Sequence, residues 1–193
     1  MNSTQPPSDP RALVRLATLF YGAALAIAVG LARAVDHPLF YRDAAAQQAG
    51  VDWIADLGLG LLAAALVIAG SALLTERTER GRALAAELAS LLGPLGLRHC
   101  LALAALSGVA EEALFRGALQ PLVGLVPASL IFGLVHFVPR RELAPWCLFA
   151  FAAGLLLGGL FEWSGNLVAP VVAHAGINAV NLRLLAARSS ARD

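Results

Sequence analysis

Four long stretches without any charged residue constrain this chain more than any other feature of its sequence. They cover residues 16–32, 57–75, 143–161 and 164–181. A helix needs roughly 20 mostly apolar residues to cross about 30 Å of hydrocarbon, and each stretch approaches that length. We therefore expect a transmembrane helix at each of these four places.

The composition excludes two broad classes of protein. Hydrophobic residues make up 59% of the chain and charged residues 14%, and the mean hydropathy is +0.72. Soluble domains carry about 25% charged residues, so an aqueous globule is excluded. The net charge is only +1. Nucleic-acid binders need a broad basic surface to displace counterions, so we expect no nucleic acid among the partners.

Two further spans are expected in the middle of the chain. Residues 99–120 are helical in length and apolar except for Glu111, Glu112 and Arg116. Proline and glycine residues at 121–127 then predict a turn, and a short apolar run leads to His136. The sequence thus predicts an all-α polytopic membrane bundle of six transmembrane helices.

The arginine distribution predicts the orientation in the membrane. Six spans place both termini on one side, together with eleven arginines, namely Arg11, Arg15, Arg77, Arg80, Arg82, Arg98, Arg140, Arg141, Arg183, Arg188 and Arg192. The opposite loops hold only Arg33 and Arg42. Positive loops face the cytoplasm, so we expect both termini there, in the inner membrane of a bacterium. A cleaved signal peptide over the first run is the less favoured alternative, because its apolar region exceeds 7–15 residues.

The predicted domain organisation follows from these spans. Residues 1–10 contain three prolines and are expected to be disordered. Residues 11–96 hold two accessory transmembrane helices and an amphipathic helix within 75–97 on the cytoplasmic surface. Residues 97–187 form a four-helix core, and 188–193 form a C-terminal tail.

Ionisable groups inside three predicted spans require a function or a partner, because each costs about 2.5–3.5 kcal/mol on insertion. Glu112 and Arg116 are four residues apart, with the acid first, which favours an ion pair within the helix. Glu111 is rotated by about 100° from Glu112 and stays the freer carboxylate. His174 and Asn178 are also four residues apart and share a helix face.

Together these groups predict peptide hydrolysis within the membrane. Glu111 and His136 would hold and deprotonate a water molecule that attacks the scissile carbonyl carbon. His174 and Asn178 would stabilise the resulting oxyanion. Taken singly, each feature has a structural explanation: a buried ion pair, a histidine at a helix end, or polar contacts between helices.

Three motifs in this order resemble those of a known family. Glu-Glu-x-x-x-Arg at 111–116, Phe-x-x-x-His at 132–136 and His-x-x-x-Asn at 174–178 are similar to the signature motifs of the CPBP intramembrane proteases. This family is also called the CAAX prenyl protease and bacteriocin-processing, or Abi, family. The resemblance covers roughly residues 97–187, and it implies a glutamate-dependent protease in which the residues listed next are catalytic: Glu111, His136, His174 and Asn178.

The same resemblance raises the question of a metal, because members of the family were first described as metalloproteases. Glu111, His136 and His174 would be the ligands of a zinc site with two histidines and one carboxylate. They lie on three different helices without a His-Glu-x-x-His pattern. A carboxylate base and oxyanion donors suffice for hydrolysis, so the favoured prediction has no cofactor, with zinc as the alternative.

The expected partners are the lipid bilayer and a membrane-anchored protein or a C-terminal sorting tail. Several bacterial relatives in the family process tail anchors, so a myxosortase-type sorting enzyme is one form of this prediction. A proton-coupled transporter and a non-catalytic membrane scaffold or immunity protein are the alternatives.

The depths in the membrane that the sequence predicts for Glu111 and His136 conflict. Glu111 lies about 20 Å into its helix when counted from Arg98, whereas His136 is four residues before Arg140. Three arrangements would reconcile their depths: a late start or kink of the third span, continuation of the fourth span beyond Pro139, or a cytoplasm-facing cavity that admits Arg140. We expect a water-filled cavity that faces the cytoplasm.

Overall fold

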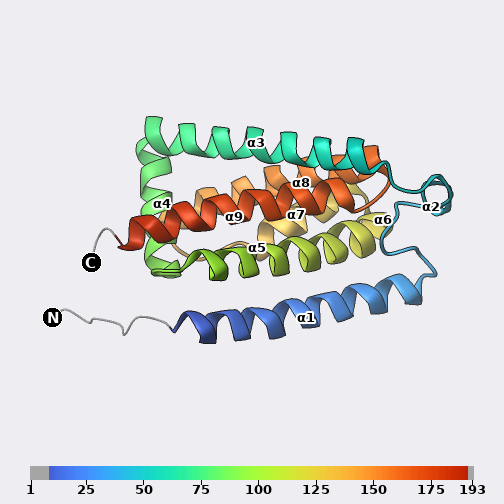
Figure 1. Ribbon diagram of the computed structural model, residues 1–193, viewed down its shortest axis with the longest axis horizontal. Helices are drawn as coiled ribbons and strands as arrows, with labels where there is room; N and C mark the ends of the chain where they lie inside the picture. Colours follow the sequence, from blue (N-terminus) through green and yellow to red (C-terminus); the bar gives the residue numbers. More distant parts are fainter. Residues whose placement is uncertain (1–8, 191–193) are drawn as a thin grey trace.

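The computed structural model describes residues 9–190 and shows a bundle of long helices (Figure 1). No strand occurs among these residues, and their only β-type contact is an isolated bridge between Tyr41 and Asn166. The predicted all-α class is therefore confirmed. The predicted disorder of residues 1–10 and the predicted tail at 188–193 fall mostly outside the described residues, although the last helix continues to Ser190.

Each of the four uncharged runs lies mostly within one long helix. In chain order these helices are α1 (Pro10–Ala34), α3 (Trp53–Arg77), α8 (Ala144–Ser164) and α9 (Val168–Ser190). All four are long and apolar enough to cross a membrane. The chain is thus a multi-pass membrane protein. The short helix α2 (Ala44–Ala49) lies in the connection between α1 and α3.

The middle of the chain is less regular, as its sequence indicates. Helix α5 (Leu97–Glu112) continues into a π-helical segment η1 (Ala113–Leu119) and a last turn α6 (Gln120–Val123). Gly124 then adopts a φ of 88°, a left-handed conformation that favours glycine and lets the chain reverse. The following helix α7 (Leu125–Val135) has 11 residues and is as short as predicted.

The predicted number of six spans is not confirmed by length and composition. Four helices pass that test, and a fifth span is obtained only by joining α4 (Glu79–Leu92) to residues 97–123 across a bend of 102°. Helix α7 is too short to cross a bilayer alone. The charges that the third span carries and the shortness of the fourth explain the difference.

One end of the bundle carries α4, which lies across the long helices near the start of α1 and the end of α9 (Figure 1). The helix covers the centre of the segment predicted to be amphipathic, and it buries Ala85 and Ala89 while its charged residues lie outside. The 3-10 turn η2 (Arg141–Leu143) approaches it, and Arg140 lies 3.9 Å from Glu87 of α4.

The lateral surface of the bundle is apolar, whereas its interior contains small and polar residues. Leu19, Ile54 and Leu148 are more than two-thirds exposed, and many other large apolar side chains are more than one-third exposed. Glu112, Arg116 and other polar groups are buried instead. Water gives no driving force for helix association inside a bilayer, so close packing of small residues and internal polar contacts hold such helices together.

Candidate active site

The motif residues come from three helices: α5 and α9 pack directly against each other, whereas α7 packs against α8 and η1. Glu111 is on α5, His136 follows the last residue of α7, and His174 and Asn178 are on α9. Helices α5 and α9 approach closely, because a Cβ atom added at Gly108 would lie 3.0 Å from both the Cβ and the backbone nitrogen of Ala175. Gly108 therefore brings Glu111 within reach of the α9 side chains.

Glu111 faces both imidazoles without a direct hydrogen bond to either. Its Oε2 atom lies 3.9 Å from Nε2 of His174 and 4.0 Å from Nε2 of His136. The carboxylate is 12% exposed, and Oε2 has no hydrogen-bond partner among the described residues. The prediction that Glu111 is the freer carboxylate of the pair is confirmed. A buried acceptor of this kind retains full capacity for a ligand.

The end of α7 fixes the orientation of His136. Its Nδ1 atom lies 2.7 Å from the carbonyl oxygen of Phe132, one of the last four carbonyls of the helix, which lack partners within the helix. A carbonyl oxygen only accepts, so Nδ1 carries the hydrogen and Nε2 of the neutral ring has a free lone pair. Trp146 also contacts this ring in an edge-to-face arrangement, with 5.4 Å between the ring centroids. The free lone pair of His136 thus points toward Glu111.

Glu112 has a larger part in the site than its sequence spacing predicts. The expected pair with Arg116 is present at 3.1 Å and is fully buried. The same Oε1 atom, however, lies 2.6 Å from Nδ1 of His174. Glu112 therefore accepts hydrogen bonds from both partners and orients His174, which the prediction of a local ion pair missed. Arg116 also donates to the carbonyl of Gly154 and lies over the ring of Phe132.

Asn178 points toward α5 rather than sharing its target with His174. Its Nδ2 atom donates to Oγ of Ser107 over 2.9 Å, and Ser107 donates in turn to the carbonyl of Ala104. The carboxamide has a second N–H, which is available to another acceptor. Sequence reasoning missed Ser107, although its hydroxyl lies four residues before Glu111 and hence on the same helix face.

The conflict in depth between Glu111 and His136 has a simple answer. Helix α5 is continuous from Leu97, and α7 ends at Val135, so neither a late start nor a continuation past Pro139 occurs. The late start of the third span and the continuation of the fourth are therefore wrong. Arg140 is about half exposed and lies 3.9 Å from Glu87 of α4. Non-helical chain after residue 136 covers the remaining distance to α4 instead.

The donor atoms do not have the spacing of a metal site. Two imidazole Nε2 atoms and one carboxylate are suitable ligands for zinc in kind. Ligands of a tetrahedral zinc ion with bonds of about 2.0–2.1 Å lie about 3.4 Å apart, whereas Glu111 is 3.9–4.0 Å from each ring. Within residues 9–190, no three histidine, cysteine or acidic side chains are grouped so that they could hold a metal ion.

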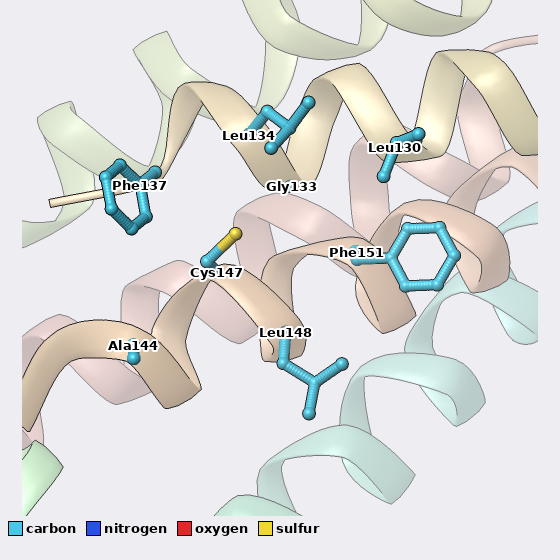
Figure 2. A pocket seen from close by; sticks show the side chains of 8 residues that line it. All are labelled: Leu130, Gly133, Leu134, Phe137, Ala144, Cys147, Leu148 and Phe151. Atoms are coloured by element: carbon cyan, nitrogen blue, oxygen red, sulfur yellow. The ribbon is translucent and has the colours of Figure 1, made fainter. Parts of the chain in front are cut away.

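Two apolar grooves lie outside the cluster of motif residues. One, of about 300 Å³, runs between α7 and α8 and is lined by the residues that Figure 2 labels, including Leu134, Phe137 and Phe151. The other, of about 440 Å³, lies among α1, α3, α5 and α9. Val109 and Ala113 line it, two residues before Glu111 and two after it. The reactive groups are therefore flanked by surfaces that suit acyl chains or apolar side chains.

Comparison with known proteins agrees with this geometry. Residues 94–180 match the family described as Type II CAAX prenyl endopeptidase Rce1-like. This segment is somewhat under half of the chain and contains all seven motif residues.

The chain is also similar to a protein of Bacillus subtilis (strain 168) named "Uncharacterized protein YpbD". The two are 49% identical over 84 residues, which cover 42% of this chain and 43% of the relative. The aligned part is thus less than half the length of that relative. No solved structure matches the chain. The family match, at residues 94–180, lies in the part of the chain that holds α5, η1, α6, α7, α8 and the first part of α9.

Proposed function

We propose that this protein is an intramembrane endopeptidase of the glutamic type. It hydrolyses a peptide bond near the C-terminus or the membrane anchor of a membrane-associated protein. The observation that carries the proposal is the unpartnered Oε2 atom of Glu111, about 4 Å from the Nε2 atoms of two imidazoles. A water molecule about 2.8 Å from both Glu111 and His136 fits this separation.

The first half of the reaction uses Glu111 and His136. The water donates a hydrogen bond to Nε2 of His136, which has its lone pair free, and gives its other proton to the Glu111 carboxylate. The water oxygen forms a bond to the scissile carbonyl carbon, and the π electrons of the carbonyl move to its oxygen. In the second half, the C–N bond breaks and the leaving amine takes the proton from Glu111.

Charge balance supports His174 as an oxyanion donor. Nδ1 of His174 carries a hydrogen, which it donates to Glu112. A neutral imidazole has only one N–H, so Nε2 also carries a hydrogen only when the ring is protonated. Two carboxylates, Glu111 and Glu112, and two cations, Arg116 and protonated His174, then sum to zero in a buried cluster. Neutrality matters here because an uncompensated buried charge costs several kcal/mol. The second N–H of Asn178 supplies the other donor.

The substrate and the location follow from the same proposal. A membrane-anchored protein or an unprenylated C-terminal sorting tail is the expected substrate, as for a myxosortase-type enzyme, and a prenylated CAAX end is the related form. The enzyme would act in the bacterial inner membrane with both termini in the cytoplasm. We propose that the reaction needs no metal or other cofactor.

The decisive experiment compares the C-termini of membrane proteins in cells with different variants. Wild type and the exposed-site control Glu142→Gln should process the same termini, whereas Glu111→Gln and His174→Ala should leave them intact. Processing that continues in both variants would refute the proposal. A proton-coupled transporter would instead retain its transport in Asn178→Ala, and full activity after metal chelation distinguishes the glutamic type from a zinc enzyme.

A further inference from the structure

The end of the bundle that carries α4 has two parts whose arginines differ in how they are balanced by acidic residues. Around α4 and η2, exposed arginines are accompanied by nearly as many acids, namely Arg77, Arg80, Arg82, Arg140 and Arg141 with Glu76, Glu79, Glu87 and Glu142. In the other part, α1 and α5 begin and α9 ends (Figure 1). Its exposed arginines form what we call the basic face: Arg11, Arg15, Arg98, Arg183 and Arg188. In the described parts of these three helix ends, the acidic residue that accompanies them is Asp9 alone.

Apolar packing gathers the basic face from three helices. Leu103 of α5 and Ala186 of α9 belong to one cluster of buried residues, and Leu13 of α1 packs against it. Each arginine of the basic face is at most five residues along its own helix from one of these three. The five guanidinium groups therefore lie around one packed contact instead of being spread over the whole end of the bundle.

The basic face is not neutralised by carboxylates within residues 9–190. The arginines that form ion pairs there all lie elsewhere, namely Arg42, Arg116 and Arg140. The carboxylate of Asp9 accepts a hydrogen bond from the backbone N–H of Arg11 over 2.9 Å and caps α1. Helix α5 begins without a side-chain cap, so its first N–H groups add partial positive charge. Arg188 complements the last carbonyls of α9, which leaves four arginines for an anion.

The surface beside the basic face is apolar. Leu16, Leu97 and Leu184 are each next to one of its arginines in the chain, and they are 66%, 57% and 49% exposed. Guanidinium groups bind phosphate oxygens through paired hydrogen bonds. A ligand that suits both surfaces has phosphate oxygens and acyl chains together. Free phosphate lacks the apolar part, and a lipid without net charge would leave the arginines unbalanced.

We propose that the basic face binds the headgroup of an anionic phospholipid, such as phosphatidylglycerol, whose acyl chains lie along the apolar surface beside it. Arginines anywhere at this end of the bundle would suffice to orient the chain in the membrane. Their concentration in one part, without acids, instead fits a localised anionic partner. The inference goes beyond the proposed function and does not depend on it.

The test measures lipid binding to the purified full-length protein in a neutral detergent by native mass spectrometry. The two lipids are dimyristoyl phosphatidylglycerol and dimyristoyl phosphatidylcholine, which have the same acyl chains. Wild type should bind the first at least about ten times more tightly. Arg15→Gln combined with Arg98→Gln should weaken that binding about 25-fold, because each arginine near an anionic surface contributes roughly a fivefold change. Arg15→Lys combined with Arg98→Lys keeps both charges and should retain most of the affinity.

The matched control is Arg77→Gln combined with Arg80→Gln, which removes the same charge from the balanced part of the same end. It should bind phosphatidylglycerol like wild type. All these positions are exposed, so thermal unfolding without lipid should be the same in every variant.

Three outcomes would overturn the inference: equal losses in the two glutamine variants, equal affinity of wild type for the two lipids, or binding of glycerol phosphate as tight as that of phosphatidylglycerol. The first would mean that the charge of the whole end acts, and the last that the acyl chains do not. Wild-type protein that processes no terminus would refute the peptidase proposal alone, because lipid binding is measured without a substrate.

Discussion

Two buried polar clusters in this bundle differ in how completely their hydrogen bonds are satisfied. Away from the site, Asn166 donates to Asp56 over 2.7 Å and to the carbonyl of Ser164, and accepts from the backbone of Val168. In the candidate site, Oε2 of Glu111 and Oε2 of Glu112 have no partner among the described residues. The first cluster joins α3 to the start of α9 and is complete in itself. The second retains capacity for a ligand, at a cost in stability.

The largest expected effect on stability comes from Glu112→Gln. This change leaves the buried guanidinium of Arg116 without its charged partner, which should lower the free energy of unfolding by about 3–5 kcal/mol. Thermal unfolding in detergent measures the loss. The matched control is Glu87→Gln, which removes an exposed pair with Arg140 and should cost about 0–1 kcal/mol. Equal effects of the two changes would show that the buried pair is not structural.

A smaller loss is expected at the satisfied cluster. Asp56→Ala leaves the Nδ2 donor of Asn166 with one acceptor fewer in a buried place, which should cost about 1–3 kcal/mol. Processing of the substrate by the folded protein should stay close to that of wild type. Loss of processing at unchanged stability would contradict the division between a structural and a reactive cluster.

The reactive cluster should respond in the opposite sense. Glu111→Leu replaces an unpartnered buried carboxylate by an apolar side chain and should raise the free energy of unfolding by about 0.5–2 kcal/mol while it abolishes processing. The same thermal assay checks the gain. A clear loss of stability would mean that Glu111 holds the fold together, as Asp56 does.

The smallest effect is expected at Asp43, which lies before α2 and is exposed. The backbone N–H of Ala46 and the guanidinium of Arg42 both lower the pKa of the Asp43 carboxyl. Because the pKa of Asp43 is lower in the folded protein, its ionised carboxylate stabilises the cap of α2 at pH values above the ordinary carboxyl pKa of about 3.9. This contribution disappears as the pH falls through the lower pKa of the folded protein. Hydrogen exchange at Ala46 should accelerate at acidic pH relative to its intrinsic rate, and Asp43→Asn should remove most of that pH dependence.

Contacts between residues close together in the sequence could be predicted, whereas contacts between residues far apart in the sequence could not. The four long helices follow from the absence of charge over successive residues, and the pair of Glu112 with Arg116 follows from helical spacing. The bond of Glu112 to His174 and that of Asn178 to Ser107 join residues 62 and 71 positions apart. Such contacts depend on which helices become neighbours, and no local pattern contains that information.

The end of the helix before His136 could not be predicted for a related reason. Counting residues along a span assumes a helix from one membrane surface to the other, whereas α7 stops at Val135. Irregular chain is tolerated at this depth where protein or water covers it, and the length of such a segment is not visible in apolar periodicity.

The premature end of α7 has a consequence for how this chemistry can be switched off. The main-chain carbonyl of Phe132 has no amide partner within the helix and accepts the hydrogen of Nδ1 of His136. This contact determines that Nε2 is the ring nitrogen without a hydrogen. Substituting nearby side chains leaves that choice untouched. An insertion that extends α7 by one more turn would give this carbonyl a backbone amide partner and leave the imidazole free to rotate. The length of the segment after residue 136, rather than its composition, therefore maintains the orientation of the imidazole.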